Sequence, residues 1–194
     1  MPGEGSQRMQ VPTRLDQYIE TTKQQSFEKD FHLGWEHYET WEEATVGERA
    51  PASHTFTVVA EDIVSYNRAC GETDPLYTDP EYALEHSPTG EVLQHPIFAT
   101  TVGFYSVGSS GIGSWMRTPG ARNPGQLIEI NEPFREGEVI TTTVTTRQKF
   151  IQRDKHYLTM FMEFHNQDGV LKGTWDCSLI LPASKARIAQ FVNA

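Results

Sequence analysis

The sequence predicts an α+β domain in which a strongly twisted antiparallel sheet wraps around one apolar helix. A series of strand-like runs fills the C-terminal half of the chain, and a continuous apolar segment, IFATTVGFYSV, begins after Pro96. A helix that is apolar on every side is expected to be buried. One face of it would carry Ile97, Thr101, Phe104 and Val107.

The N-terminal part of the chain is predicted to begin with a short helix. Thr13, followed three residues later by Asp16, resembles the capped start of a helix that ends near Gln25. Such a helix would pack on the main domain or on another subunit. Aromatic residues recur from Trp35 to Val46, which indicates irregular structure or a first strand at the edge of the core.

A strand followed by a helix is expected between His54 and Gly71. The segment HTFTVV has the β-branched and aromatic content of a strand. The segment AEDIVSYNRAC starts with acidic residues and places Ile63, Asn67 and Cys70 on one helical face. Because a glycine commonly follows a helix C-terminus, we expect this helix to end at Gly71.

A second short helix is predicted from Pro80 to about His86. Asp79 can cap its start, proline fits the first helical position, and Glu81 suits the positive end of the helix dipole. The sequence Ser-Pro-Thr-Gly then interrupts the chain before the apolar segment.

The chain after the apolar helix is predicted to form a long loop and then an antiparallel meander. Residues 108–125 are rich in glycine and serine, and GSSGIGS in this stretch is expected to be a flexible loop. The strand-like runs that follow are QLIEINEPF, VITTTVTTRQKFI, HYLTMFMEFHN and VLKGTWDCSLILP. The Asp168-Gly169 step between the last two runs is a strong hairpin signal.

Composition excludes several classes of function. The net charge of -10 argues against nucleic acid or an anionic membrane surface as the main partner. The sequence contains no run of about 18 apolar residues, so no membrane span is predicted. The seven histidines do not pair at ligand spacing, so no metal site is expected. The two cysteines lack metal spacing and the first residues lack a secretory signal, so we expect a cytoplasmic protein.

Candidate catalytic residues gather before the apolar helix. Glu72, Asp74, Tyr77 and His95 are separated by turn residues. A hydratase needs a carboxylate to activate water and a second group to deliver a proton. Each of the four residues also has a structural interpretation: Asp74 as a turn or cap residue, Glu72 as the remnant of a site, Tyr77 as core or pocket lining, and His95 as a helix-start contact.

The start of the apolar helix offers donors for a thioester carbonyl. Exposed backbone amides at a helix N-terminus can polarise such an oxygen. Because the Pro96 nitrogen carries no hydrogen, the useful donors there would be the amides of Ile97 and Phe98. These two residues are therefore candidate substrate-binding residues.

At these residues the chain resembles the MaoC-like enoyl-CoA hydratases and dehydratases. The resemblance is carried by GETDPLYTD (71–79), by Glu81-Tyr82-Ala83 and by Gln94-His95-Pro96, with HYETWEEATVGE upstream and PFREGEVI downstream. The hairpin FIQRDKHYLTM is similar to that of the FAS1-like dehydratase branch. The resemblance implies a hot-dog fold, with an N-terminal extension at 1–35, the hot-dog domain at 36–182 and a C-terminal tail at 183–194.

Two positions depart from the family motif. The family's catalytic Asp falls on Glu72 and its catalytic His falls on Tyr77. Glutamate can still act as a base, but its extra methylene moves the carboxylate by about 1 Å, enough to disturb a near-attack geometry. Tyrosine, which ionises near pH 10 in model peptides, is a poor replacement for histidine in proton transfer near neutrality. Both departures indicate lost or altered catalysis.

The resemblance implies work on an acyl-CoA or other acyl thioester, with coenzyme A as part of the substrate and no cofactor. Three versions stay open: an active homodimer that hydrates 2-enoyl thioesters to 3-hydroxyacyl thioesters, a non-catalytic subunit of a heteromer with a second hot-dog subunit, and an acyl-CoA thioesterase. Basic residues are candidates for contacts to the phosphates of coenzyme A, or else solvated surface charges; they are Arg117, Arg122, Lys149, Arg153 and Lys155.

Overall fold

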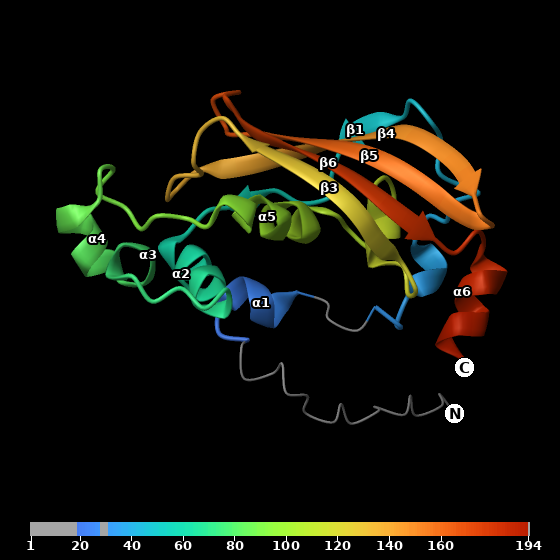
Figure 1. Cartoon of the computed structure of the whole chain (residues 1–194), viewed down its shortest axis with the longest axis horizontal. Helices are drawn as coiled ribbons and strands as arrows, with labels where there is room; N and C mark the ends of the chain where they lie inside the picture. The colour runs from blue at the N-terminus through green and yellow to red at the C-terminus, as the bar shows by residue number, and fades with distance from the viewer. Residues whose placement is uncertain (1–18, 28–30, 194) are drawn as a thin grey trace, which may run out of the picture.

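A computed structural model describes residues 19–27 and 31–193 of the chain. A curved antiparallel sheet covers helix α5, and helices α2, α3 and α4 gather at one end of the molecule (Figure 1). The strands are β1 (Arg49–Pro51), β2 (Phe56–Thr57), β3 (Arg122–Ile130), β4 (Val139–Gln152), β5 (Lys155–His165) and β6 (Leu171–Leu181). The α-helices are α1 (Thr22–Ser26), α2 (Ala60–Ala69), α3 (Pro75–Thr78), α4 (Pro80–His86), α5 (Ala99–Ser106) and α6 (Lys185–Val192), with short 3-10 helices η2 (Trp35–His37), η3 (Pro96–Phe98) and η4 (Ser114–Arg117).

The strand order in the sheet is β1-β4-β5-β6-β3, and β2 pairs with β4 beside this path. Strands β4, β5 and β6 form the predicted meander. The β4–β5 turn has positive φ at both Arg153 and Asp154, as a type I′ turn requires. The prediction that β3 pairs with the next run was wrong, because β3 pairs with β6 instead. After β3 the chain crosses to β2, where the Gly137 amide donates to the Val58 carbonyl at 2.9 Å.

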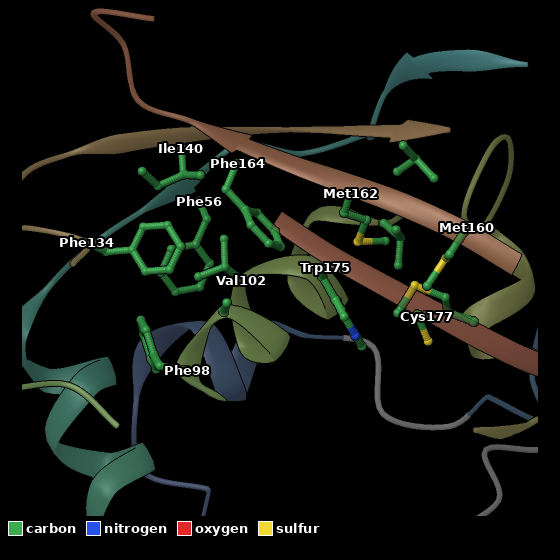
Figure 2. Close-up of a cluster of buried hydrophobic side chains, with 14 of the residues drawn as sticks. Phe56, Phe98, Val102, Phe134, Ile140, Met160, Met162, Phe164, Trp175 and Cys177 are labelled. Atoms are coloured by element: carbon green, nitrogen blue, oxygen red, sulfur yellow. The ribbon is translucent and has the colours of Figure 1, made fainter. Parts of the chain in front are cut away.

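The core lies between the concave face of the sheet and α5. Alternate residues of β5 and β6 point inward, among them Met160, Met162 and Trp175 (Figure 2). Gly103 of α5 lies against Trp175, and a Cβ at this glycine would be 2.9 Å from the Trp175 ring. The glycine therefore lets the helix approach the sheet closely.

Helix α5 is buried on one face only, so the expectation that the whole helix is buried was wrong. Its buried residues include Val102 and Gly103. Ile97 in the preceding turn and Phe104 are 40% and 37% exposed. Small residues on the side toward the sheet allow close approach. On the opposite side the sheet makes no cover, and Ile97 and Phe104 remain partly exposed.

The glycine-rich segment after α5 is part of the core, which corrects the expectation of a flexible surface loop. Residues 112–119 are all buried. Trp115 is fully buried, and its indole Nε1 lies 3.5 Å from the Met160 sulfur. The glycines shape this segment: Gly113 has a φ of +90° and lies where a Cβ would be 2.7 Å from Val107. Strand β3 also begins before the predicted run, at Arg122.

The predicted N-terminal helix falls partly on residues that the structure does not describe, and within the described residues helix α1 begins at Thr22. Thr13 and Asp16 lie outside the described residues, and the observed helix α1 is capped by Thr21, whose Oγ1 accepts from the Gln24 amide. The predicted strand at 54–59 is reduced to β2. By contrast, α2 begins and ends close to its predicted positions, and α4 spans Pro80–His86 as predicted.

Candidate functional site

A single buried asparagine assembles the candidate site. Asn67, on the inner face of α2, is completely buried. Its Nδ2 donates to the carbonyls of Tyr77 and Leu93, both at 2.8 Å, and its Oδ1 accepts from the His95 amide at 3.0 Å. One side chain thus joins α2 to the end of α3 and to the segment 93–95. The sequence placed Asn67 on one face of this helix with the apolar Ile63. A polar residue on a face that becomes buried could have indicated a structural hydrogen-bonding role, but this role was not predicted.

The Glu72 carboxylate is engaged by its own turn. Its Oε1 accepts from the amides of Asp74 at 3.0 Å and Thr73 at 2.8 Å. These two hydrogen bonds lower the pKa of Glu72 and outweigh desolvation, which acts to raise it, and the charge of His95 makes the least contribution to the lowering. Glu72 is therefore ionised at neutral pH, and as a base it holds a proton weakly.

Asp74 caps helix α3. Its Oδ1 accepts from the Leu76 amide at 2.9 Å, and its side chain is exposed. Pro75 follows as the first helical residue, so the Asp-Pro pair starts the helix as capping chemistry requires. The structural interpretation of Asp74 thus accounts for its carboxylate.

Tyr77 is half-buried and lines a small cavity of about 160 Å³. Phe134 and Arg135, from the segment before β4, and Glu91 also line this cavity. Tyr77 therefore lines a pocket beside the site, as its structural interpretation predicted.

His95 precedes η3 and occupies both predicted amide donors. Its Nδ1 accepts from the Ile97 amide at 3.3 Å, and its carbonyl accepts from the Phe98 amide at 2.9 Å. The Phe98 side chain is fully buried in the core. The Ile97 amide is the weaker-bound of the two, and rotation of the imidazole would release it to a ligand. The Ile97 carbonyl accepts from the Thr100 hydroxyl at 2.8 Å.

Within a single chain, the predicted substrate-binding residues Arg122 and Arg153 lie away from Glu72, Tyr77 and His95. Both are exposed. Arg153 forms the turn at the far end of β4, whereas α3 and α4 lie at the opposite end of the molecule (Figure 1). Two other arginines flank the site: Arg68 donates to the Thr78 carbonyl at 3.0 Å, and Arg135 lies 4.0 Å from Glu91.

The described part of the chain offers no cluster of three or more His, Cys, Asp or Glu side chains that could hold a metal ion. Within residues 19–27 and 31–193, no helix is long and apolar enough to cross a membrane. The chemistry available at the site is that of carboxylates, one imidazole, one phenol and helix-terminal amides.

Comparison with known proteins identifies the family of the chain. The model of the FAS1-like, dehydratase domain region matches residues 44–171. The chain belongs to this family. Helices α1 and α6 lie outside the matched residues. No curated protein matches the chain.

Solved structures confirm the hot-dog fold of this FAS1-like dehydratase region. R-hydratase PhaJ1 from Pseudomonas aeruginosa is similar over 76% of this chain and 88% of its own, with a TM-score of 0.60 and 17% identity. A MaoC-like dehydratase from Rhodospirillum rubrum is similar over 75% and 98%, with a TM-score of 0.59 and 20% identity. The 3R-hydroxyacyl-ACP dehydratase complex HadBC from Mycobacterium tuberculosis is similar over 72% and 98%, with a TM-score of 0.59 and 15% identity.

Proposed function

We propose that this chain is the acyl-thioester-binding, non-catalytic subunit of a hot-dog dehydratase that interconverts 2-enoyl and 3-hydroxyacyl thioesters. The observation that carries the proposal is that the carboxylates of both acidic candidates accept hydrogen bonds from neighbouring backbone amides. Glu72 accepts from two amides of its own turn, and Asp74 caps α3. Tyr77 occupies the position of the family's catalytic His. A carboxylate with a lowered pKa is a weak base, and general base catalysis near neutrality favours a stronger one.

Assembly with another hot-dog subunit fits the exposed surfaces of the chain. Strand β3 lies at the edge of the sheet, and Leu127 on it is 59% exposed. An uncovered edge strand is a ready site for pairing with another chain. The similar HadBC and ChsH1-ChsH2 structures are complexes of differently named chains. Both cysteines are free thiols, which suits our further proposal of a reducing, cytoplasmic location.

One observation favours an active homodimer as the second candidate. Glu72 is ionised, and the charge of His95 contributes to the lowering of its pKa. A single chain therefore places a carboxylate and an imidazole close enough to interact electrostatically. In that version Glu72 acts as the base, and His95 or Tyr77 delivers the proton. The substrate is in either case an acyl-CoA or another acyl thioester.

The test is an assay of the purified chain with crotonyl-CoA and longer enoyl-CoA thioesters, following loss of the conjugated enoyl thioester. We expect no turnover by the chain alone and turnover when a co-purifying hot-dog partner with an intact Asp and His is added. Turnover by the chain alone that Glu72→Gln abolishes, and that the matched exposed control Glu81→Gln leaves unchanged, would establish the second candidate instead. Release of free thiol would indicate a thioesterase.

A further inference from the structure

We propose that a cavity beneath α1 binds the aliphatic acyl chain of the thioester, and that Phe27 and Tyr105 form its end wall. The cavity has a volume of about 320 Å³ and lies between α1, α2 and α5. Four aromatic rings contribute to its lining: Phe27, Phe56, Phe104 and Tyr105. The other lining residues are Thr21, Gln24, Thr100 and Thr101 and the ion pair of Lys23 with Asp62. This assignment rests on the proposed function for the identity of the ligand, but its geometry is independent of catalysis.

The cavity begins beside the candidate site. Thr100 lines it, and the Thr100 hydroxyl donates to the carbonyl of Ile97, the residue whose amide is held by His95. A thioester placed at this turn would therefore direct its chain along the α5 face that carries Thr101 and Phe104. This is the apolar face that the sheet leaves uncovered. An aliphatic chain would cover it and gain the free energy of apolar burial.

The outer wall comes from a segment outside the family match. Lys23 of α1 forms an ion pair with Asp62 of α2, whose side chain is only 5% exposed. Gln24 adds a hydrogen bond from its Nε2 to the Ser65 hydroxyl at 3.2 Å. The Lys23 ammonium also lies 4.8 Å from the centre of the Phe56 ring. These contacts fix α1 over the cavity, so the N-terminal extension gives this chain a wall that residues 44–171 do not supply.

The end wall separates two cavities. The rings of Phe27 and Tyr105 are stacked at 6.1 Å with an interplanar angle of 28°. Both residues also line a second cavity of about 340 Å³ beyond them, near His54 and Arg117. If a methylene group needs roughly the 30 Å³ share of a water molecule, the first cavity holds at most about ten. Removal of the Phe27 ring would join the two cavities and admit a longer chain.

Binding of saturated acyl-CoA thioesters tests this proposal without any catalytic step. The full chain is titrated calorimetrically with butanoyl-, octanoyl-, dodecanoyl- and hexadecanoyl-CoA. We expect affinity to rise by up to about fourfold per buried methylene and then to level off at medium chain length. In Phe27→Ala the rise should continue to hexadecanoyl-CoA. In Thr101→Trp, which fills the cavity, the longer chains should bind more weakly while butanoyl-CoA is unaffected.

Phe150→Ala is the matched control, because Phe150 is a half-exposed ring on the β4–β5 hairpin, outside the cavity lining. It should leave the chain-length profile unchanged. Dissociation constants that do not depend on chain length, undetectable binding, or equal effects of Phe27→Ala and Phe150→Ala would overturn the assignment. If the profile shifts as expected but no hydration occurs with any partner, the cavity stands and the proposed function fails. If hydration occurs with a partner but the chain-length profile does not shift, the proposed function stands and the cavity assignment fails.

Discussion

Glu72 and Glu138 are both glutamates with a lowered pKa, but their partners differ. Glu72 is bound by amides of its own turn, near solvent. Glu138 lies at the start of β4 and joins distant elements: it accepts from Lys172 at 2.9 Å, Asn166 at 3.0 Å and the Arg135 amide at 2.8 Å. Lys172 is 1% exposed. The same direction of pKa shift thus accompanies a local turn in one case and a buried structural network in the other.

This difference between local and buried partners indicates which substitutions should change stability and which should change function. A surface carboxylate that is bound only by amides of its own turn can be changed without loss of the fold. A buried pair cannot be broken without leaving an uncompensated charge. Substitution of a residue near the site that is held by buried contacts should therefore lower the free energy of unfolding. Substitution of a residue that is held only by local contacts should change only binding or turnover.

The largest effect is expected for Glu138→Ala. Removal of this carboxylate leaves Lys172 with only the more distant Glu132 oxygen at 3.3 Å. We expect a loss of about 3–5 kcal/mol in the free energy of unfolding, the cost of breaking a buried pair. Denaturant unfolding measures it, with Glu72→Ala as the comparison. A similar loss in both variants would show that the distinction between local and buried partners is wrong.

The Asn67 hub should come next. Asn67→Ala leaves the Tyr77 and Leu93 carbonyls and the His95 amide without their shared partner. We expect a loss of about 2–4 kcal/mol, since each unsatisfied group costs about 1–3 kcal/mol and water reaches some of them. Amide hydrogen exchange should rise in residues 72–95 and remain low in β5 and β6. Faster exchange spread evenly over the sheet would argue against a hub that serves the site.

Local signals in the sequence predicted part of this molecule well. The Asp79-Pro80 pair fixed the start of α4 because capping and proline geometry act within one turn. The hairpin at Asp168 and Gly169 was predictable for the same reason. The pairing of β3 with β6 was not, because register and neighbour depend on contacts far apart in sequence.

The candidate site shows the same limit. Asn67 joins the segments that carry Tyr77 and His95, and Glu72 and Asp74 adjoin them, whereas the catalytic roles of these four residues stay a prediction. The contact of His95 with the start of η3 was predicted as one interpretation of this residue and is confirmed. The engagement of Glu72 with the amides of Thr73 and Asp74 was not predicted, because it depends on the conformation of the turn. The buried position of residues 112–119 also escaped prediction, because glycine and serine favour loops whether or not tertiary packing covers them.

Acid should weaken the fold through the carboxylates with lowered pKa values. Burial acts to raise the pKa of Glu138, but hydrogen bonds from Lys172, the Arg135 amide and Asn166 outweigh it and lower the pKa below its ordinary value of 4.5. The stability that this group contributes is present above pH 4.5 and is lost as the pH falls through the folded-state pKa.

Urea unfolding between about pH 6 and pH 3 measures this loss. We expect the free energy of unfolding to fall more steeply with acid in the wild-type chain than in Glu138→Gln, which keeps the shape of the side chain and lacks the titrating group. Parallel pH profiles for the two proteins would show that Glu138 contributes nothing to the acid sensitivity.

Glu39 should give the smallest effect, and of opposite sign. Burial, followed by the charges of Glu48 and Glu43, raises the pKa of Glu39 against the effect of Lys185. An acid with a raised folded-state pKa destabilises the fold as the pH rises above its unfolded value, because ionisation is then easier in the unfolded chain. Glu39→Gln should therefore raise Tm at neutral pH by less than the 2–4 °C that about 1 kcal/mol gives a chain of this size. The gain should vanish near pH 4, roughly where unfolded glutamate becomes protonated.

The exposed neighbour Glu36 provides the matched control for this measurement. Glu36→Gln should leave Tm unchanged across the same pH range, because the side chain is exposed and the substitution keeps the backbone carbonyl that accepts from Lys185. A lower Tm for Glu39→Gln at neutral pH would mean that the attraction of Lys185 exceeds the cost of burial at Glu39. The comparison with Glu138 would then extend to a third carboxylate that stabilises the fold in its ionised form.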